Sequence, residues 1–267
     1  MKGEKNMGKL FSNVKDFFGK VGDNLSFLAV FIVVVVAVFL LAYAIEKLIQ
    51  KKNNVTGKIL STRKIAMIGM FSAISGILMV FEFQVPFLAP SFYELDASEI
   101  PVLICGFAFG PVAGVVSEFL KVLVKLILKS TSTAFVGDLA NFAVGCTFIL
   151  PAVSIYHLKK SKKMAIVGCV VGTLCMTIFG TAFNAIYLVP TFAKMMKTDL
   201  QTIINAASGL PLGWLVKDIT TFVMICVAPL NLLKGVGISV ITILIYKPLS
   251  PIIKYSHNER IQRKKSE

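Results

Sequence analysis

Long stretches of this sequence have no charged residue over the length that a membrane crossing requires. Residues 25–45 read LSFLAVFIVVVVAVFLLAYAI, and residues 164–193 continue for 30 residues without Asp, Glu, Lys or Arg. A spanning helix needs about 20 mainly apolar residues. Only 16% of the chain is charged and its mean hydropathy is +0.79, whereas soluble domains are about one quarter charged. The sequence therefore predicts an all-α integral membrane protein.

The other apolar segments predict how many helices cross the membrane. A core of six spans is expected at 65–81, 101–109, 112–128, 139–158, 164–193 and 229–247, with 25–45 as an additional N-terminal span. A tight hairpin at Gly110-Pro111 separates the second and third spans, because proline fits the first turn of a helix. Residues 194–228 are predicted to be an external or re-entrant segment with an amphipathic helix. Pro229 would then begin the last span, whose 19 residues extend about 28 Å as a helix.

The domain organisation follows from these segments. We predict an N-terminal extension at 1–61, with one transmembrane helix at about 25–45 and a basic cytoplasmic linker. A six-helix membrane domain at 62–247 and a basic cytoplasmic tail at 248–267 follow. An alternative for 25–45 is a signal peptide, because AYA at 42–44 resembles a small-x-small cleavage site. The leader of 24 residues and the long apolar run favour a retained helix.

The positive charge predicts the orientation in the membrane. The formal net charge is +14, and lysines and arginines cluster in EKLIQKKNNVTGKILSTRK, KKSKK and KYSHNERIQRKKSE, between or after apolar runs. Basic loops face the cytoplasm, which predicts a multi-pass membrane protein with a cytoplasmic C-terminus. The acidic loop 82–99 then lies outside, as does 1–24 despite its lysines. Aromatic residues do not interleave with the basic runs, which argues against nucleic-acid binding.

Several kinds of chemistry are missing from the sequence. The five cysteines lie in apolar runs without a CxxC pair, and there are only two histidines. We therefore predict no disulfide and no metal site. Because neither a GxxxxGK[ST] phosphate loop nor an HExxH motif occurs, the chain is predicted to be neither an ATPase nor a metalloprotease. No catalytic residues and no cofactor are predicted.

Four polar residues fall at the same depth in the predicted bundle. Asn141, Asn184, Asn231 and Lys234 all lie toward the outer ends of their spans, where Asp138 and the acidic loop with Asp96 border them. Membrane asparagines often connect neighbouring helices by hydrogen bonds, so interhelical contact is one interpretation. An intramembrane lysine indicates a functional site. Because these side chains supply hydrogen bonds without acid or base machinery, the set favours a pocket for a planar, mostly uncharged heterocycle.

Other polar and small residues give further expectations. Glu118 and Lys121 are three apart and should pair with each other, while Lys125 and Lys129 should extend outward to the interface. We find no inverted repeat and predict no buried carboxylate suited to coupling ions. In the first core span, Gly69 and Ala73 are four residues apart, as are Ser72 and Gly76, a spacing that lets another helix approach closely.

Four segments in order resemble one family of membrane proteins. ELDASEIPVLICGFAFGPVAG, GDLANFAVG, FNAIYLVP and PLNLLKG look like the riboflavin-specific substrate-binding (S) component of energy-coupling factor (ECF) vitamin transporters, the RibU type. The resemblance extends from about Arg63 to Lys247. It implies a six-helix S component that captures riboflavin at its outer face. It also implies a transmembrane coupling protein and two cytosolic ATPases, which drive toppling of the S component to release the vitamin inside.

The resemblance also assigns residues to roles. Asn184 of FNAIY, with Asn231 and Lys234 of PLNLLKG, resembles the family's contacts to the flavin ring, and Asn141 of DLANF is carried over with them. The loop 83–99 resembles the lid over the pocket. The small residues of the first core span (Gly69, Ser72, Ala73 and Gly76) match the family's contact surface for the coupling protein.

This chain departs from the family pattern in three places, and two other functions remain open. Asp138 stands where glutamate is expected, Leu230 where phenylalanine is commoner, and the helix at 25–45 is additional. One alternative is an S component for another vitamin or flavin. Another is a stand-alone secondary carrier, which would transport its substrate without any ATPase.

Overall fold

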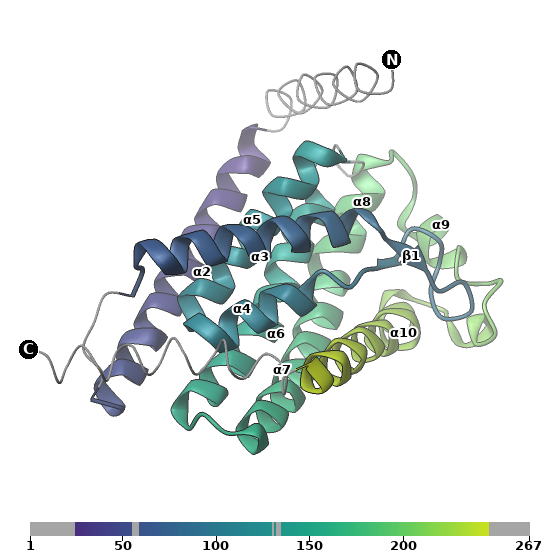
Figure 1. Ribbon diagram of the computed structural model, residues 1–267. Helices are drawn as coiled ribbons and strands as arrows, with labels where there is room; N and C mark the ends of the chain where they lie inside the picture. Colours follow the sequence, from purple (N-terminus) through teal and green to yellow (C-terminus); the bar gives the residue numbers. More distant parts are fainter. Residues whose placement is uncertain (1–24, 55–58, 130, 132–134, 246–267) are drawn as a thin grey trace, which may run out of the picture.

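The structure is a computed structural model that describes residues 25–54, 59–129, 131 and 135–245. The predicted tail at 248–267 and the leader at 1–24 lie outside these residues. Helices α2 to α7 come first along the described chain. They are α2 (Leu25–Lys52), α3 (Thr62–Val80), α4 (Glu99–Phe109), α5 (Pro111–Leu128), α6 (Val136–Leu158) and α7 (Lys162–Phe183). They pack as a helical bundle, with α2 along one side and the last helix on the other (Figure 1).

Shorter elements connect and extend these helices. Strands β1 (Phe83–Gln84) and β2 (Glu94–Leu95) form an antiparallel hairpin in which Phe83 pairs with Leu95. The elements after α7 are the π turn η1 (Asn184–Leu188), α8 (Val189–Met195), α9 (Leu200–Asn205), the 3₁₀ turn η2 (Gly213–Leu215), α10 (Ile219–Phe222) and the π turn η3 (Val223–Val227). The last helix continues from there, so that one helical segment covers Ile219–Ile245.

The all-α membrane architecture is confirmed, but the count of six spans plus one is not. Within the described residues, helices long and apolar enough to cross a bilayer are Ala29–Lys52, Thr62–Val80, Val136–Leu158, Lys162–Lys194 and Ile219–Ile245. Helix α4 has 11 residues, or about 16 Å, too short to cross alone. Helix α5 has 18 residues but carries Glu118, Lys121 and Lys125. Both helices are largely buried within the bundle, so neither has to meet lipid along its whole length.

The sequence explains where the helices begin and turn. Ser61 and Ser161 cap α3 and α7 by accepting the backbone N–H groups of Lys64 and Met164, as serine does at many helix starts. Between α4 and α5 the chain turns at Gly110, which has a φ of 115°, a conformation that glycine adopts easily. The predicted hairpin at Gly110-Pro111 is therefore confirmed.

Helices α6 and α7 approach each other most closely at two glycines. A Cβ atom on Gly168 would lie 2.4 Å from the carbonyl oxygen of Ala152, and one on Gly172 would lie 2.6 Å from that of Phe148. These residues therefore have to be glycine for the two backbones to meet at this distance. The close approach holds the first half of α7 against the second half of α6. Of the predicted site residues, Asp138 and Asn141 lie on α6, and Asn184 lies in η1, which directly follows α7.

Helix α2 is joined to the core by rings and by one buried carboxylate. Phe31 lies 6.2 Å from Phe142 of α6, and Phe39 lies 6.1 Å from Phe119 of α5, between ring centroids. Near its end, the Oε2 atom of Glu46 accepts the backbone N–H of Val112 at 2.9 Å, in the first turn of α5. The retained N-terminal helix that the sequence predicts is thus packed against α5 and α6, and it extends to Lys52 rather than ending at residue 45.

The predicted start of the last span at Pro229 is wrong. The helix begins ten residues earlier, where Asp218 caps it by accepting the backbone N–H of Thr221 at 2.8 Å. Pro229 lies inside the helix, directly after η3 and Ala228. Proline lacks the N–H that an α-helix needs, and here the wider π turn precedes it, with the Ala228 N–H bonded to the Val223 carbonyl. Pro190 follows η1 in the same way.

The small residues of α3 lie on two different faces. Ser72 is buried and bonds Ser117 of α5 at 3.1 Å, and a Cβ on Gly76 would lie 2.5 Å from the side chain of Val124. Both residues therefore contact α5 within this chain and are not available to another protein. Gly69 and Ala73 are exposed, and nothing lies within 4 Å of a Cβ built on Gly69.

Candidate ligand-binding site

A cavity of about 240 Å³ opens between the hairpin and the surrounding helices. Of the six residues proposed from the sequence, five line it: Asp138, Asn141, Asn184, Asn231 and Lys234. They come from α6, η1 and the last helix, which supports the argument that residues at one depth would meet. The hairpin contributes Phe92, Tyr93, Glu94 and Leu95 to the lining, so the loop expected to act as a lid covers this cavity.

Asn184 is held in place by two hydrogen bonds. Its Nδ2 atom donates to the carbonyl oxygen of Gly180 at 2.7 Å, and its Oδ1 atom accepts the hydroxyl of Tyr93 at 2.8 Å. Burial raises the pKa of the Tyr93 phenol, so this hydroxyl stays a donor at neutral pH. Tyr93 is a site residue that the sequence analysis did not single out. The only indication in the sequence was that Tyr93 is an aromatic residue within the acidic loop 82–99.

Asn231 lies opposite a glycine of α7. A Cβ on Gly180 would be 2.8 Å from the Nδ2 atom of Asn231, so the absence of a side chain at 180 leaves room for this amide. The carbonyl oxygen of Gly180 therefore accepts a hydrogen bond from the Asn184 amide. The Cα side of the same residue borders the Asn231 amide. The two asparagines meet at one glycine, on helices whose π turns lie nearby in sequence.

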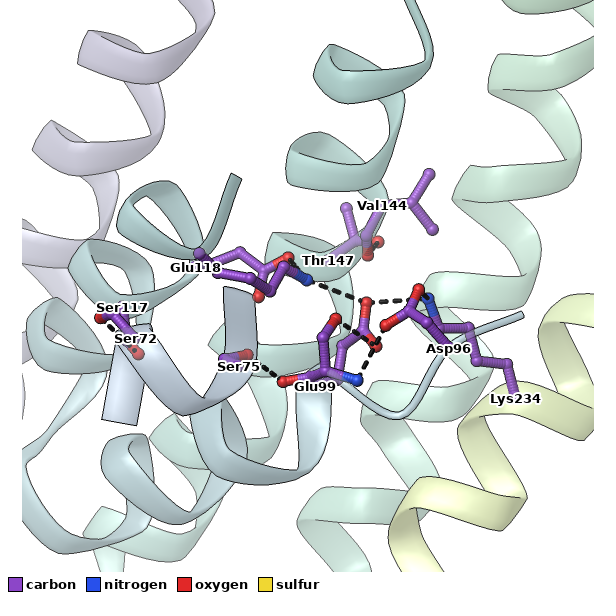
Figure 2. A network of polar contacts seen from close by, with 11 residues as sticks. Ser72, Ser75, Asp96, Glu99, Ser117, Glu118, Val144, Thr147 and Lys234 are labelled. Carbon is purple, nitrogen blue, oxygen red and sulfur yellow. Dashed lines mark hydrogen bonds and ion pairs between the residues drawn. The ribbon is translucent and has the colours of Figure 1, made fainter. Parts of the chain in front are cut away.

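Lys234 reaches the cavity with its ammonium between two carboxylates. Its Nζ atom lies 3.1 Å from Oδ2 of Asp96 and 2.9 Å from Oε1 of Glu99, an arrangement visible in Figure 2. Asp96 is the predicted residue that does not line the cavity. Its Oδ1 atom instead accepts the backbone N–H of Ser98 at 2.8 Å, before α4 begins.

Asp96 carries its charge although it is buried. Burial alone opposes ionisation, but the ammonium groups of Lys234 and Lys121 outweigh it and hold the pKa of Asp96 well below its usual range. Asp96 and Glu99 belong to the acidic loop 82–99, which is predicted from the sequence to be external. Both are buried instead, because each faces a lysine from another helix.

The ion pairs continue from Glu99 into the bundle. Oε1 of Glu99 also lies 3.1 Å from Nζ of Lys121, which lies 2.6 Å from Oε1 of Glu118. The predicted pairing of Lys121 with Glu118 is confirmed. The sequence predicts no buried carboxylate suited to coupling ions; Glu99 and Glu118 are buried, at 1% and 0% exposed, and each is paired with a lysine. Their partners come from other helices, which a helix-by-helix reading does not reveal.

The opposite wall of the cavity carries further charges. Lys125 was expected to extend outward, but it is buried and its Nζ atom lies 2.7 Å from Oδ1 of Asp138. Lys129 is more exposed and pairs with Glu82 at 2.6 Å. Oδ2 of Asp138 and Oδ1 of Asn141 are buried without a hydrogen-bond partner in the described part of the chain. Because an unpartnered buried acceptor costs about 1–3 kcal/mol, these atoms favour a ligand that donates hydrogen bonds.

Other site types find no support among the residues that the structure describes. No group of three or more His, Cys, Asp or Glu side chains there could hold a metal ion. The five cysteines are free, and four of them are buried. The cavity therefore offers amides, a phenol and paired charges, a set that binds by hydrogen bonding.

Comparison with known proteins identifies the family. Residues 63–246 match the family described as ECF transporter, substrate-specific component. The chain is 32% identical over 192 residues to the riboflavin transporter RibU of Staphylococcus aureus (strain TCH60). This alignment covers 72% of this chain and 93% of that protein. It is 28% identical over 203 residues to the riboflavin transporter FmnP of Bacillus subtilis (strain 168), covering 76% and 100%.

A solved structure agrees with this assignment. The structure described as "Structure and mechanism of the S component of a bacterial ECF transporter" is 33% identical, with a TM-score of 0.56, and the match covers 72% of this chain and 98% of that one. The family match begins and ends within one residue of the segment in which the sequence motifs indicated a resemblance. The chain therefore belongs to the family of substrate-specific components of ECF transporters.

Proposed function

We propose that this protein binds riboflavin in the cavity beneath the β1–β2 hairpin and supplies it for uptake into the cell. The observation that carries the proposal is the meeting of Asn184, Asn231 and Lys234 in one cavity. Two relatives are named riboflavin transporters, which supports the same ligand. The chain acts as a binding subunit and has no catalytic role of its own.

The chemistry of the cavity suits a flavin. An isoalloxazine ring presents carbonyl oxygens and one imide N–H group along one edge, which match the amides of Asn184 and Asn231 and the ammonium of Lys234. The unpartnered acceptors of Asp138 and Asn141 match the hydroxyl donors of a sugar-alcohol chain. Aromatic side chains of the hairpin and α8 would cover the apolar ring. Among them are Phe92 and Phe192, whose ring centroids lie 5.6 Å apart.

Release of the ligand inside the cell requires partners in this proposal. The cavity faces the outside when basic loops face the cytoplasm, and the C-terminus is then cytoplasmic. A transmembrane coupling protein and two cytosolic ATPases would drive inward release by toppling the bundle. The exposed residues Gly69 and Ala73 of α3 are the proposed contact for the coupling protein, because small residues four apart allow a close helix crossing.

Purification in detergent tests the ligand directly. The protein is freed of flavin by washing, titrated with riboflavin, and followed by quenching of the flavin fluorescence. We expect saturable 1:1 binding, with thiamine at the same concentrations giving no competition. Absence of binding at micromolar riboflavin would refute the proposed ligand, and competition by thiamine would refute its specificity.

A stand-alone carrier is a second candidate because of one observation. Glu118 is fully buried, and one of its oxygens has no hydrogen-bond partner among the residues that the structure describes. Buried carboxylates serve as coupling groups in secondary carriers. The two candidates differ in their need for ATPases. Cells that express this chain without any ECF ATPase should show no riboflavin accumulation if it is an S component, whereas accumulation that collapses with the proton gradient would favour the carrier.

A further inference from the structure

We propose that Glu99 is a positioning residue that holds the ammonium of Lys234 at the wall of the cavity, and that Lys121 in turn holds Glu99. The proposal rests on riboflavin as the ligand. It adds a role for two residues, one of which lies outside the cavity, since Glu99 lines the cavity and Lys121 does not.

A single oxygen atom joins the two lysines. Oε1 of Glu99 lies 2.9 Å from Nζ of Lys234 and 3.1 Å from Nζ of Lys121, and its Oε2 atom lies 3.4 Å from the hydroxyl of Ser98. Glu99 and Lys121 are shielded from water, with side chains 2% and 0% exposed, whereas the side chain of Lys234 is 12% exposed. Figure 2 shows Glu99 between Glu118 and Lys234.

The arrangement controls how many donors Lys234 can offer to a ligand. A lysine ammonium has three N–H donors on a flexible four-carbon chain. Asp96 and Glu99 accept two of them, and this fixes the side chain and leaves one donor for a carbonyl oxygen of the ligand. With Glu99 neutral, Lys234 keeps one charged partner, and its flexible chain is no longer fixed from two sides.

The charge balance of the cluster supplies a matched control. The carboxyl groups of Asp96, Glu99 and Glu118 share the two ammonium groups of Lys121 and Lys234 in this cluster. Glu99→Gln and Glu118→Gln therefore make the same substitution, a carboxyl group to a carboxamide of the same shape, within one cluster. Of these two residues, Glu99 is the one that forms an ion pair with Lys234 in the described part of the chain. A role that depends only on the number of carboxyl groups in the cluster therefore predicts the same binding for both variants.

The experiment measures riboflavin binding and ligand-free melting temperature for wild type, E99Q, E118Q, K234M and the double variant E99Q/K234M. We expect E99Q to raise Kd at least tenfold and E118Q to change it by no more than about twofold. The melting temperatures of the two ligand-free single variants should be similar. In the double variant Kd should match that of K234M, because Glu99 acts through Lys234.

Each contrary result has a distinct meaning. Equal Kd values for E99Q and E118Q would overturn the positioning role while leaving riboflavin binding intact. A double variant that binds more weakly than K234M would show that Glu99 contacts the ligand itself. If E99Q does not fold, Glu99→Asp replaces it, and wild-type affinity with this shorter carboxylate would overturn the proposal. Failure of the wild type to bind riboflavin would instead refute the proposed function and this role with it.

Discussion

Substitution of Asn231 tests the proposed ligand site directly. Its amide lies against Gly180 and lines the cavity. Asn231→Ala should weaken riboflavin binding by about 1–3 kcal/mol, since a buried polar contact of the ligand loses its partner. The change is measured by fluorescence titration. Leu232→Ala is the control, because the Leu232 side chain lies on the same helix and is 45% exposed. Equal affinities for both variants would show that Asn231 has a structural role only.

A second prediction concerns Gly180. A Cβ at this position would lie 2.8 Å from the Asn231 amide, so Gly180→Ala should displace that side chain and weaken riboflavin binding roughly tenfold, about 1.4 kcal/mol. The fold should persist, because the displaced atom ends a flexible side chain. Ligand-free melting temperature checks the fold, and wild-type affinity with an unchanged melting temperature would contradict the prediction.

The charge on Asp96 makes stability depend on acid pH. Lys234 and Lys121 lower the pKa of Asp96 against the effect of burial, so ionised Asp96 stabilises the folded state above the unfolded pKa of about 3.9. This contribution is lost as the pH falls toward the lower, folded pKa. The melting temperature of the ligand-free wild type should therefore decrease more steeply below about pH 4 than that of Asp96→Asn. Parallel curves would contradict this assignment.

Single residues also show what the sequence could predict about the site. The depth of Asn141, Asn184, Asn231 and Lys234 follows from the position of each in its span, which is why all four line the cavity. The partners of Lys234 could not be predicted, because Asp96 is 138 residues away. Periodicity places Lys125 on the face of Lys121, but it does not say that Asp138 of the next helix neutralises it.

At the scale of the element, α2 offers a test of its own. Glu46 accepts the Val112 N–H in the first turn of α5 and lies 3.7 Å from Lys64 of α3. Glu46→Ala should lower stability by about 1–2 kcal/mol, as loss of a helix cap does, and reduce the ligand-free melting temperature. Riboflavin affinity should change little, since Glu46 does not line the cavity. Leu48→Ala, on the exposed side of α2, should leave the melting temperature unchanged.

Element boundaries were predicted well where a turn residue decides them and poorly where burial decides them. Gly110 and Pro111 end α4 and begin α5 as expected, because their backbone preferences are local. Pro229 misled the prediction, since the preceding π turn allows proline inside a helix. Helix α4 was counted as a span although 11 residues do not cross lipid; its neighbours bury it, and hydrophobicity alone does not separate burial in protein from burial in lipid.

For the whole molecule, ligand binding should appear as a gain in stability. A ligand that binds only the folded state stabilises it by about 2.7 kcal/mol at a concentration of 100 times Kd. Riboflavin at this excess should therefore raise the melting temperature of the wild type, and the rise should be much smaller in K234M at the same riboflavin concentration. Equal rises in both proteins would show that the flavin stabilises the fold from somewhere other than this cavity.

The two π turns have a consequence for how such proteins diverge. Each contains one residue more than the α turn that it replaces, and one residue rotates the following helix by about 100°. Asn231 and Lys234 follow η3, and α8 follows η1. Loss of one codon in either turn would swing a different set of side chains toward the ligand while the helices keep their number and order. Ligand preference within this fold would then change by a single-residue deletion as readily as by substitution inside the cavity.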